Sequence, residues 1–150
     1  MRAPSSRPAV MSGVMVLAAA LASGAEQPQD CLKYEPELVT LHGTIERQSF
    51  PGPPNYESVK DGDALEIYWF LRLDQPLCVV GTDDPYNPAQ AEVERVQLVF
   101  KGPDAYKRYR ALMGRKAIAT GTLYGAQTAH HKTPLLISVV DLAAAARKLR

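Results

Sequence analysis

Apolar and polar residues alternate along two early segments of the chain. In the segment 39–45, Val39, Leu41 and Ile45 share one face with Gly43, and polar residues occupy the other. The segment 64–73 alternates in the same way, and its apolar face consists of Leu65, Ile67, Trp69, Leu71 and Leu73. Alternation with a period of two is typical of half-buried strands, so we expect a strand over each segment.

The rest of the chain predicts three more strands and two helices. The strands are expected at 93–100, 116–124 and 134–141. After the first of these, the period changes to that of a helix, which begins near Gly102-Pro103-Asp104 and ends at Gly114. The tail 143–150 predicts a short C-terminal helix with basic residues in its last turn.

The order strand, strand, strand, helix, strand, strand is that of the five-stranded OB-type barrel. We therefore expect a mainly β protein with an OB-like barrel. Gly43 and Gly121 each precede a threonine and an aliphatic residue. We interpret both glycines as bends that allow the first and fourth strands to lie side by side in a closed barrel. An open α+β sheet is the alternative fold.

The N-terminal 25 residues have the composition of a secretory signal. Arg2 and Arg7 precede an apolar run over 9–22, and small residues lead to Ala25 before the sequence becomes polar. The apolar run is shorter than the roughly 20 residues that a membrane span requires. We expect a signal peptide over 1–25, a single OB-like domain over 26–150 and a periplasmic or secreted protein with no stable membrane span after cleavage.

The charge balance argues against nucleic acid as a partner. The chain has 17 Lys and Arg residues and 16 Asp and Glu residues, and removal of 1–25 takes away only basic residues. Binding of phosphate backbones requires concentrated positive charge, which this balance does not provide. Two cysteines in an exported chain predict one disulfide, between Cys31 and Cys78.

A stiff aromatic segment follows the first predicted strand. This proline-rich loop, residues 50–58, combines three prolines and Gly52 with Phe50 and Tyr56. In an OB barrel it would connect strands one and two, and the histidine loop, residues 127–133, would connect strands four and five. These two connections flank the usual OB ligand face. We expect one binding site formed by Phe50, Pro53, Asn55, Tyr56, Glu57, Thr128, His130, His131 and Thr133.

These side chains favour binding over catalysis. Aromatic rings offer stacking surfaces, and the amide, hydroxyl and imidazole groups offer hydrogen bonds. No serine or cysteine lies in a nucleophile-elbow pattern, and no pair of acids stands out, so no catalytic residue is assigned. We expect a binding module without a cofactor whose ligand is a small molecule, a peptide, a glycan fragment or an envelope protein.

Two alternative functions remain. His130 and His131, with His42, would make the chain a metal-binding protein or a metal-dependent envelope enzyme. Adjacent residues on an extended segment point to opposite sides, which opposes a shared ion. The proline-rich loop could instead plug another envelope protein, in which case the chain is an inhibitor or an accessory subunit.

Four motifs together resemble a known family. They are Cys31-Leu32-Lys33-Tyr34-Glu35-Pro36, Phe50-Pro51-Gly52-Pro53-Pro54-Asn55-Tyr56-Glu57-Ser58, Pro76-Leu77-Cys78-Val79, and Gly121-Thr122-Leu123 leading to His130-His131-Lys132-Thr133-Pro134. The combination resembles an uncharacterised family of small exported bacterial proteins, a domain of unknown function, over about 31–140. The resemblance implies export and the position of the site, and it implies no ligand. The family often has another histidine near Lys132 or Gly125, and its absence here weakens the metal alternative.

Overall fold

The computed structural model describes residues 30–146, so the predicted signal peptide over 1–25 lies outside the described residues. Its five strands are β1 Leu38–Pro51, β2 Leu65–Val79, β3 Gln90–Phe100, β4 Lys116–Gly125 and β5 Leu135–Ala144. One short helix, α1 Asp104–Tyr109, and the 3₁₀ turn η2 Arg110–Leu112 connect β3 to β4, and the 3₁₀ turn η1 Val59–Asp61 lies between β1 and β2. No helix within 30–146 is long and apolar enough to cross a membrane.

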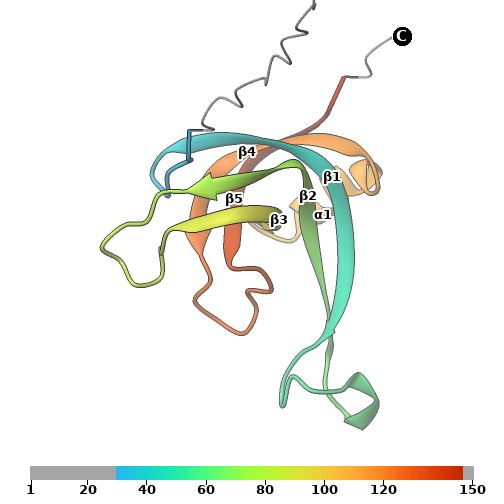
Figure 1. Cartoon of the computed structure of the whole chain (residues 1–150). Helices are drawn as coiled ribbons and strands as arrows, with labels where there is room; N and C mark the ends of the chain where they lie inside the picture. The colour runs from blue at the N-terminus through green and yellow to red at the C-terminus, as the bar shows by residue number, and fades with distance from the viewer. Residues whose placement is uncertain (1–29, 147–150) are drawn as a thin grey trace, which may run out of the picture.

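The five strands form a closed barrel in the order β1-β2-β3-β5-β4 (Figure 1). β1 closes it, because residues 43–51 pair with β2 and residues 38–44 pair with β4, both antiparallel. β3 and β5 pair in parallel. The predicted five-stranded OB-like barrel is confirmed, and the open sheet is excluded.

Gly43 and Gly121 each lie close to the backbone of a neighbouring strand. A Cβ atom on Gly43 would lie 2.3 Å from the carbonyl oxygen of Arg72, and one on Gly121 would lie 2.1 Å from that of Ser138. Gly43 and Thr44 are the two residues of β1 that are paired with both β2 and β4, and Gly121 follows a register shift between β4 and β5. The prediction that the first and fourth strands lie side by side is confirmed. Each glycine is required by the close approach of a different neighbour, β2 at Gly43 and β5 at Gly121, because no larger residue fits without moving a strand.

The core fills the barrel with side chains from every strand. The fully buried members are mainly aliphatic: Ile45, Leu71, Val96, Leu98, Leu123, Leu135 and Ile137. At one end, the ring of Trp69 lies 5.7 Å from that of Phe100 and 5.4 Å from that of Tyr106. Because Tyr106 belongs to α1, this aromatic cluster places the helix over the end of the core.

The predicted disulfide between Cys31 and Cys78 is confirmed. It joins the segment before β1 to the end of β2, where Leu32 also donates its N–H to the carbonyl of Cys78. Tyr34 of the same segment is buried, and its hydroxyl donates a hydrogen bond of 2.7 Å to the carbonyl of Pro88. The segment is therefore part of the packed domain.

The helix predicted over 143–150 does not begin at Ala143. Ala143 and Ala144 continue β5 and pair with Ile118 and Ala117 of β4, and Ala145 donates its N–H to the carbonyl of Lys116. Residues 147–150 lie outside the described residues. The alanines favour a helix locally, but the free edge of β4 supplies backbone partners that a helix at this position would leave unpaired.

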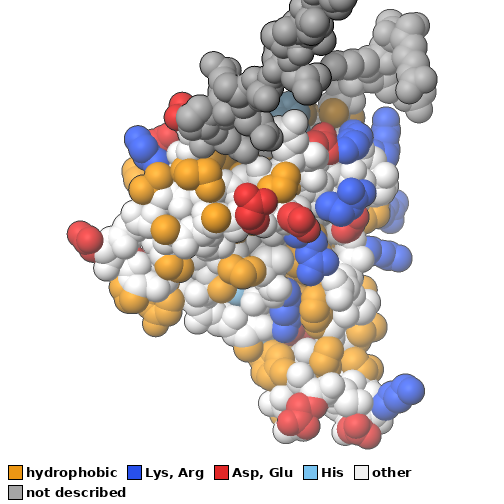
Figure 2. Space-filling view, viewed as in Figure 1, with side chains coloured by type: hydrophobic (Ala, Val, Ile, Leu, Met, Phe, Trp, Pro, Cys, Tyr) orange, Lys and Arg blue, Asp and Glu red, His pale blue; other side chains and the backbone are white. Residues whose placement is uncertain are grey.

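β1 and β2 are longer than predicted and project from the barrel as a two-stranded arm (Figure 1). Phe50 and Pro51, expected in a loop, are instead the last residues of β1. Leu65 and Ile67, expected in the core, are 59% and 48% exposed because the arm has left the barrel at this point. Figure 2 shows hydrophobic surface along the arm and charged side chains at its end.

Candidate functional site

Three aromatic rings, two from the arm and one from the proline-rich loop, lie around the ammonium group of Lys132. The nitrogen Nζ lies 5.3 Å from the ring centroid of Phe50, and 5.5 Å from those of Tyr56 and Tyr68. All three distances are within the roughly 6 Å over which a ring attracts a cation. We call these three rings the aromatic cage.

Two members of the cage come from the outer face of the arm. Phe50 pairs with Glu66, which makes Tyr68 its diagonal neighbour across the strands, and their ring centroids are 5.9 Å apart. Phe50 also lies 6.1 Å from the fully buried ring of Phe70, over which the guanidinium of Arg95 stacks at 4.4 Å. Packing on the outer face of β1 and β2 thus positions the rings of Phe50 and Tyr68 independently of the two loops.

The third member, Tyr56, comes from the proline-rich loop and has an unusual backbone. Its φ of 61° is in the left-handed region, which a residue with a side chain adopts at a cost. Its N–H donates to the carbonyl of Gly52 at 2.9 Å. This conformation brings the ring of Tyr56 to 5.9 Å from the ring of His130, so the two predicted loops meet.

The carboxylate of Asp63 holds the proline-rich loop in shape. One oxygen accepts the N–H of Asn55 at 2.9 Å, and the other accepts the N–H groups of Glu57 at 2.8 Å and Ser58 at 2.9 Å. Asp63 is buried, and these bonds, that of Ser58 first, lower the pKa of its carboxyl below the usual value. Asn55 and Glu57 therefore contribute backbone donors to the loop, and their side chains remain exposed.

Asp63→Asn is expected to reduce the loss of stability in acid. Because the folded-state pKa of Asp63 is depressed, its contribution is present above the unfolded value of about 3.9 and is lost as pH falls toward the folded value. The amide of asparagine accepts fewer N–H bonds than the carboxylate does. The free energy of unfolding of the variant is therefore lower at pH 7 and falls less between pH 5 and pH 2. Urea unfolding at these pH values measures the difference. Asp61→Asn, in the exposed turn η1, is the control, and equal acid loss in wild type and Asp63→Asn contradicts the assignment.

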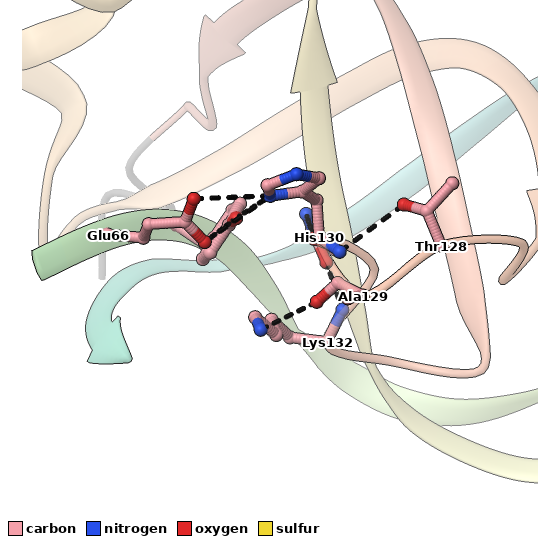
Figure 3. A network of polar contacts seen from close by, with 7 residues as sticks. Glu66, Thr128, Ala129, His130 and Lys132 are labelled. Carbon is pink, nitrogen blue, oxygen red and sulfur yellow. Dashed lines mark hydrogen bonds and ion pairs between the residues drawn. The ribbon is translucent and has the colours of Figure 1, made fainter. Parts of the chain in front are cut away.

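Tyr68 of the cage forms a polar trio with Glu66 and His130. Figure 3 shows Glu66 and His130 facing each other. The Tyr68 hydroxyl donates to Glu66 Oε2 at 2.5 Å, which leaves its oxygen free to accept from Nδ1–H of His130 at 2.9 Å. His130 Nδ1 also lies 3.2 Å from Glu66 Oε1. β2 thus supplies two polar partners that orient the imidazole of the histidine loop.

The trio is suited to binding a positive or hydrogen-bonding group. The hydrogen bond from Tyr68 lowers the pKa of Glu66, with smaller effects in the same direction from His130 and Lys132, so the carboxylate is ionised at neutral pH. Burial, and then the contact with Glu66, raise the pKa of Tyr68, so its hydroxyl keeps its proton. A tyrosine of this kind donates hydrogen bonds and is a poor nucleophile or base.

Gln97 of β3 anchors the histidine loop through both ends of its side-chain amide. Its nitrogen Nε2 donates to the carbonyl of His130 at 3.0 Å, and its oxygen Oε1 accepts the N–H of Lys132 at 2.6 Å. Gln97 is buried, so these bonds replace solvent contacts that it has lost. The backbone on either side of His131 is therefore fixed independently of the side chains of His130 and Lys132.

The structure separates the nine predicted site residues into three sets of three. Phe50, Tyr56 and His130 meet at the cage, and Pro53, Asn55 and Glu57 lie on the exposed loop next to it. The other three, Thr128, Thr133 and His131, have contacts that support the structure of the loop. Thr128 accepts the backbone N–H of His130 at 3.3 Å and shapes the turn. Thr133 is buried, and its hydroxyl accepts the N–H of Gln97 and donates to the carbonyl of Leu135.

The imidazole of His131 has different partners from that of His130. Its Nδ1 accepts the N–H of Gln127 at 2.8 Å, its ring lies 5.6 Å from that of Tyr124, and burial lowers its pKa. His42 is eight residues before Phe50 on β1 and lines a separate cavity of about 380 Å³ with Leu41 and Asp74. Within 30–146, no group of three or more His, Cys, Asp or Glu side chains could hold a metal ion. The three histidines do not form one site.

Sequence reasoning did not assign Asp63, Glu66, Tyr68, Gln97 or Lys132 to the site. Glu66 and Tyr68 had a detectable signal, because they alternate with the apolar residues of the second strand and lie opposite the end of the first. Asp63 and Gln97 act on backbone groups, which no side-chain pattern reveals.

A family model described as a domain of unknown function, DUF4431, matches residues 95–143. The matched segment contains most of β3, all of β4 and nearly all of β5, together with Gln97 and the histidine loop. It does not contain β1, the proline-rich loop or β2. No curated protein matches the chain. Over residues 95–143, the chain is thus similar to an uncharacterised domain family.

Proposed function

We propose that this protein is an exported binding module whose ligand lies over the aromatic cage, between the proline-rich loop and the histidine loop. The observation that carries the proposal is the meeting of these two loops, with the rings of Tyr56 and His130 5.9 Å apart. In OB barrels, the face of strands two and three between these two connections is the usual ligand surface. Tyr68 of β2 and Arg95 of β3 occupy that face here.

The strained backbone of Tyr56 supports a binding role for this loop. A glycine or asparagine would adopt a φ of 61° at lower cost. Tyrosine is therefore not the residue that stability of the fold would select at this position. Residues held in such conformations concentrate at functional sites. The cost is understandable if the ring of Tyr56 is needed next to His130 and Lys132.

The chemistry of the face fits a small molecule, a peptide, a glycan fragment or a segment of an envelope protein. Its rings offer stacking area, and Glu66, His130 and the exposed side chains of Asn55 and Glu57 offer both donors and acceptors. The nearly equal numbers of acidic and basic residues disfavour nucleic acid.

Export is part of the proposal, with residues 1–25 as the cleaved signal of a small bacterial periplasmic or secreted protein. The Cys31–Cys78 disulfide supports it, because disulfides persist mainly in oxidising compartments. The intact mass of the protein recovered from a secreting host tests it. Cleavage after Ala25 leaves Glu26 at the N-terminus, whereas a mass that includes 1–25 contradicts export by this route.

Binding is tested by NMR titration of the ¹⁵N-labelled protein with three defined probes: chitotriose, the peptide Lys-Lys-Lys and the peptide Ala-Ala-Ala. We expect at least one to shift the amides of Tyr56, Tyr68 and Ala129 together, and Tyr56→Ala to weaken that response at least tenfold. Val140→Ala, which truncates an exposed apolar residue beside α1, is the control and should bind like wild type. Shifts confined to other surfaces, or an unchanged response in Tyr56→Ala, would place the ligand elsewhere.

A further inference from the structure

The side chain of Lys132 occupies the centre of the proposed binding face. Its ammonium group contacts all three rings of the aromatic cage. It also donates a hydrogen bond of 2.6 Å to the carbonyl of Ala129 (Figure 3). We infer that the aromatic cage is a site for a primary ammonium group on a flexible alkyl chain, and that Lys132 fills it when no ligand is bound. The inference rests on the proposed function and specifies the ligand class.

The surroundings of the cage select a positive charge. The faces of aromatic rings attract cations, and three rings act on one nitrogen here. The carboxylate of Glu66 lies beside the cage, where it is held by Tyr68 and His130. A neutral or anionic group at the same point would lose the attraction of the rings, and an anion would also be repelled by Glu66.

The hydrogen-bonding pattern favours a primary ammonium over a quaternary one. The carbonyl of Ala129 accepts an N–H bond from the group in the cage, and a quaternary ammonium has no N–H to donate. The ammonium group that now occupies the cage belongs to Lys132, whose side chain carries it on four methylene groups. A lysine-bearing peptide or an alkyl diamine has the required end group.

Lys132 can leave the cage without unfolding the histidine loop. The loop backbone is held by the amide of Gln97 at the carbonyl of His130 and the N–H of Lys132. Thr128 holds the turn through the N–H of His130. None of these bonds involves the Lys132 side chain, which is half-buried and starts from an otherwise exposed turn. Rotation of that side chain therefore vacates the cage and leaves its walls in place.

A ligand must compete with Lys132, so removal of this side chain should strengthen binding. The effective concentration of a tethered group is high, and the ammonium of Lys132 makes the same contacts as the incoming one. We expect Lys132→Ala to bind n-butylammonium, which reproduces the end of a lysine side chain, about tenfold more tightly than wild type does.

The experiment titrates n-butylammonium chloride into ¹⁵N-labelled wild type and Lys132→Ala at constant ionic strength and follows the amides of Tyr56, Tyr68 and Ala129. Butan-1-ol, which has the same chain without the charge, is titrated in parallel and should produce at least tenfold weaker binding. Lys107→Ala, on α1, removes an exposed lysine far along the chain from the cage and should match wild type. Phe50→Leu added to Lys132→Ala keeps apolar volume but removes one ring, and should weaken butylammonium binding several-fold.

Lys132→Gln keeps the length of the side chain and loses its charge, so it replaces Lys132→Ala if the latter does not fold. Equal butylammonium affinity in wild type and the Lys132 variants, or equal responses to butylammonium and butan-1-ol, would overturn the inference. If chitotriose or Ala-Ala-Ala shifts the same amides while butylammonium does not, the binding function stands and the ammonium assignment is wrong. If no probe shifts these amides in wild type or variant, both are wrong.

Discussion

Reduction of the Cys31–Cys78 disulfide is expected to lower the free energy of unfolding by about 4 kcal/mol. The bridge joins residues 47 positions apart, and a cross-link of this span restricts the unfolded chain by about that amount on the chain-entropy model. Stability measured by urea unfolding with and without reductant tests the value. A loss of this size is a large part of the total stability of about 5–15 kcal/mol that is usual for a domain.

The double variant Cys31→Ser/Cys78→Ser is the matched control for this measurement. It should be less stable than the oxidised wild type by about the same amount, and reductant should not change it further. The buried Tyr34 gives a local readout, because its hydroxyl also accepts a bond of 2.8 Å from Gln90 and its environment changes if the tethered segment detaches. A loss below about 1 kcal/mol on reduction would show that packing of this segment, and not the cross-link, holds the N-terminal part in place.

Gly121→Val is expected to destabilise the barrel by more than about 3 kcal/mol, because overpacking against a fixed backbone has no inexpensive relaxation. The new Cβ would lie 2.1 Å from the carbonyl oxygen of Ser138 and 2.9 Å from the side chain of Ile137. β4 and β5 would have to separate at a point where both are paired. Urea unfolding and the shift of the melting temperature measure the loss.

Gly114→Ala is the comparison that separates crowding from backbone strain. Gly114 has a φ of 75° and open space around the position of a Cβ atom, so its replacement carries only the cost of a left-handed backbone, about 1–2 kcal/mol. Gly121 has no positive φ, so a side chain there is opposed only by the contact with β5. Equal losses in the two variants would mean that the close approach of β4 and β5 is not the constraint on Gly121.

The barrel could be predicted from the sequence because its determinants are local and periodic. Alternation located the strands, the change of period located α1, and Gly43 and Gly121 marked the points of closure. Alternation indicates which side chains share a face and does not indicate whether that face is covered. Leu65 and Ile67 were therefore assigned to the core, although they lie on the arm, outside the core.

The meeting of the two loops could be predicted from the sequence, but the contacts between them could not. The order of the strands placed the two loops on one side of the barrel, and the contact between Tyr56 and His130 is consistent with that placement. The position of the Lys132 ammonium group among the three rings of the cage depends on the register of β1 against β2. It also depends on the bond by which Gln97 anchors the backbone of Lys132. Such long-range contacts between a side chain and the backbone leave no periodic trace in the sequence.

The arm has a further consequence for the behaviour of the protein at high concentration. Pairing of β2 with β3 begins at Trp69, so residues 65–68 run along the arm with one edge beside no strand of the described chain. Exposed strand edges are templates for edge-to-edge aggregation between copies of a protein. Pro51, Pro53 and Pro54 remove three N–H donors from the end of this hairpin, and the charged Glu66 lies on its edge strand. The charge of Glu66 on this edge strand, and the missing N–H of Pro51 in the strand beside it, thus make the arm a poor template for fibril-like growth.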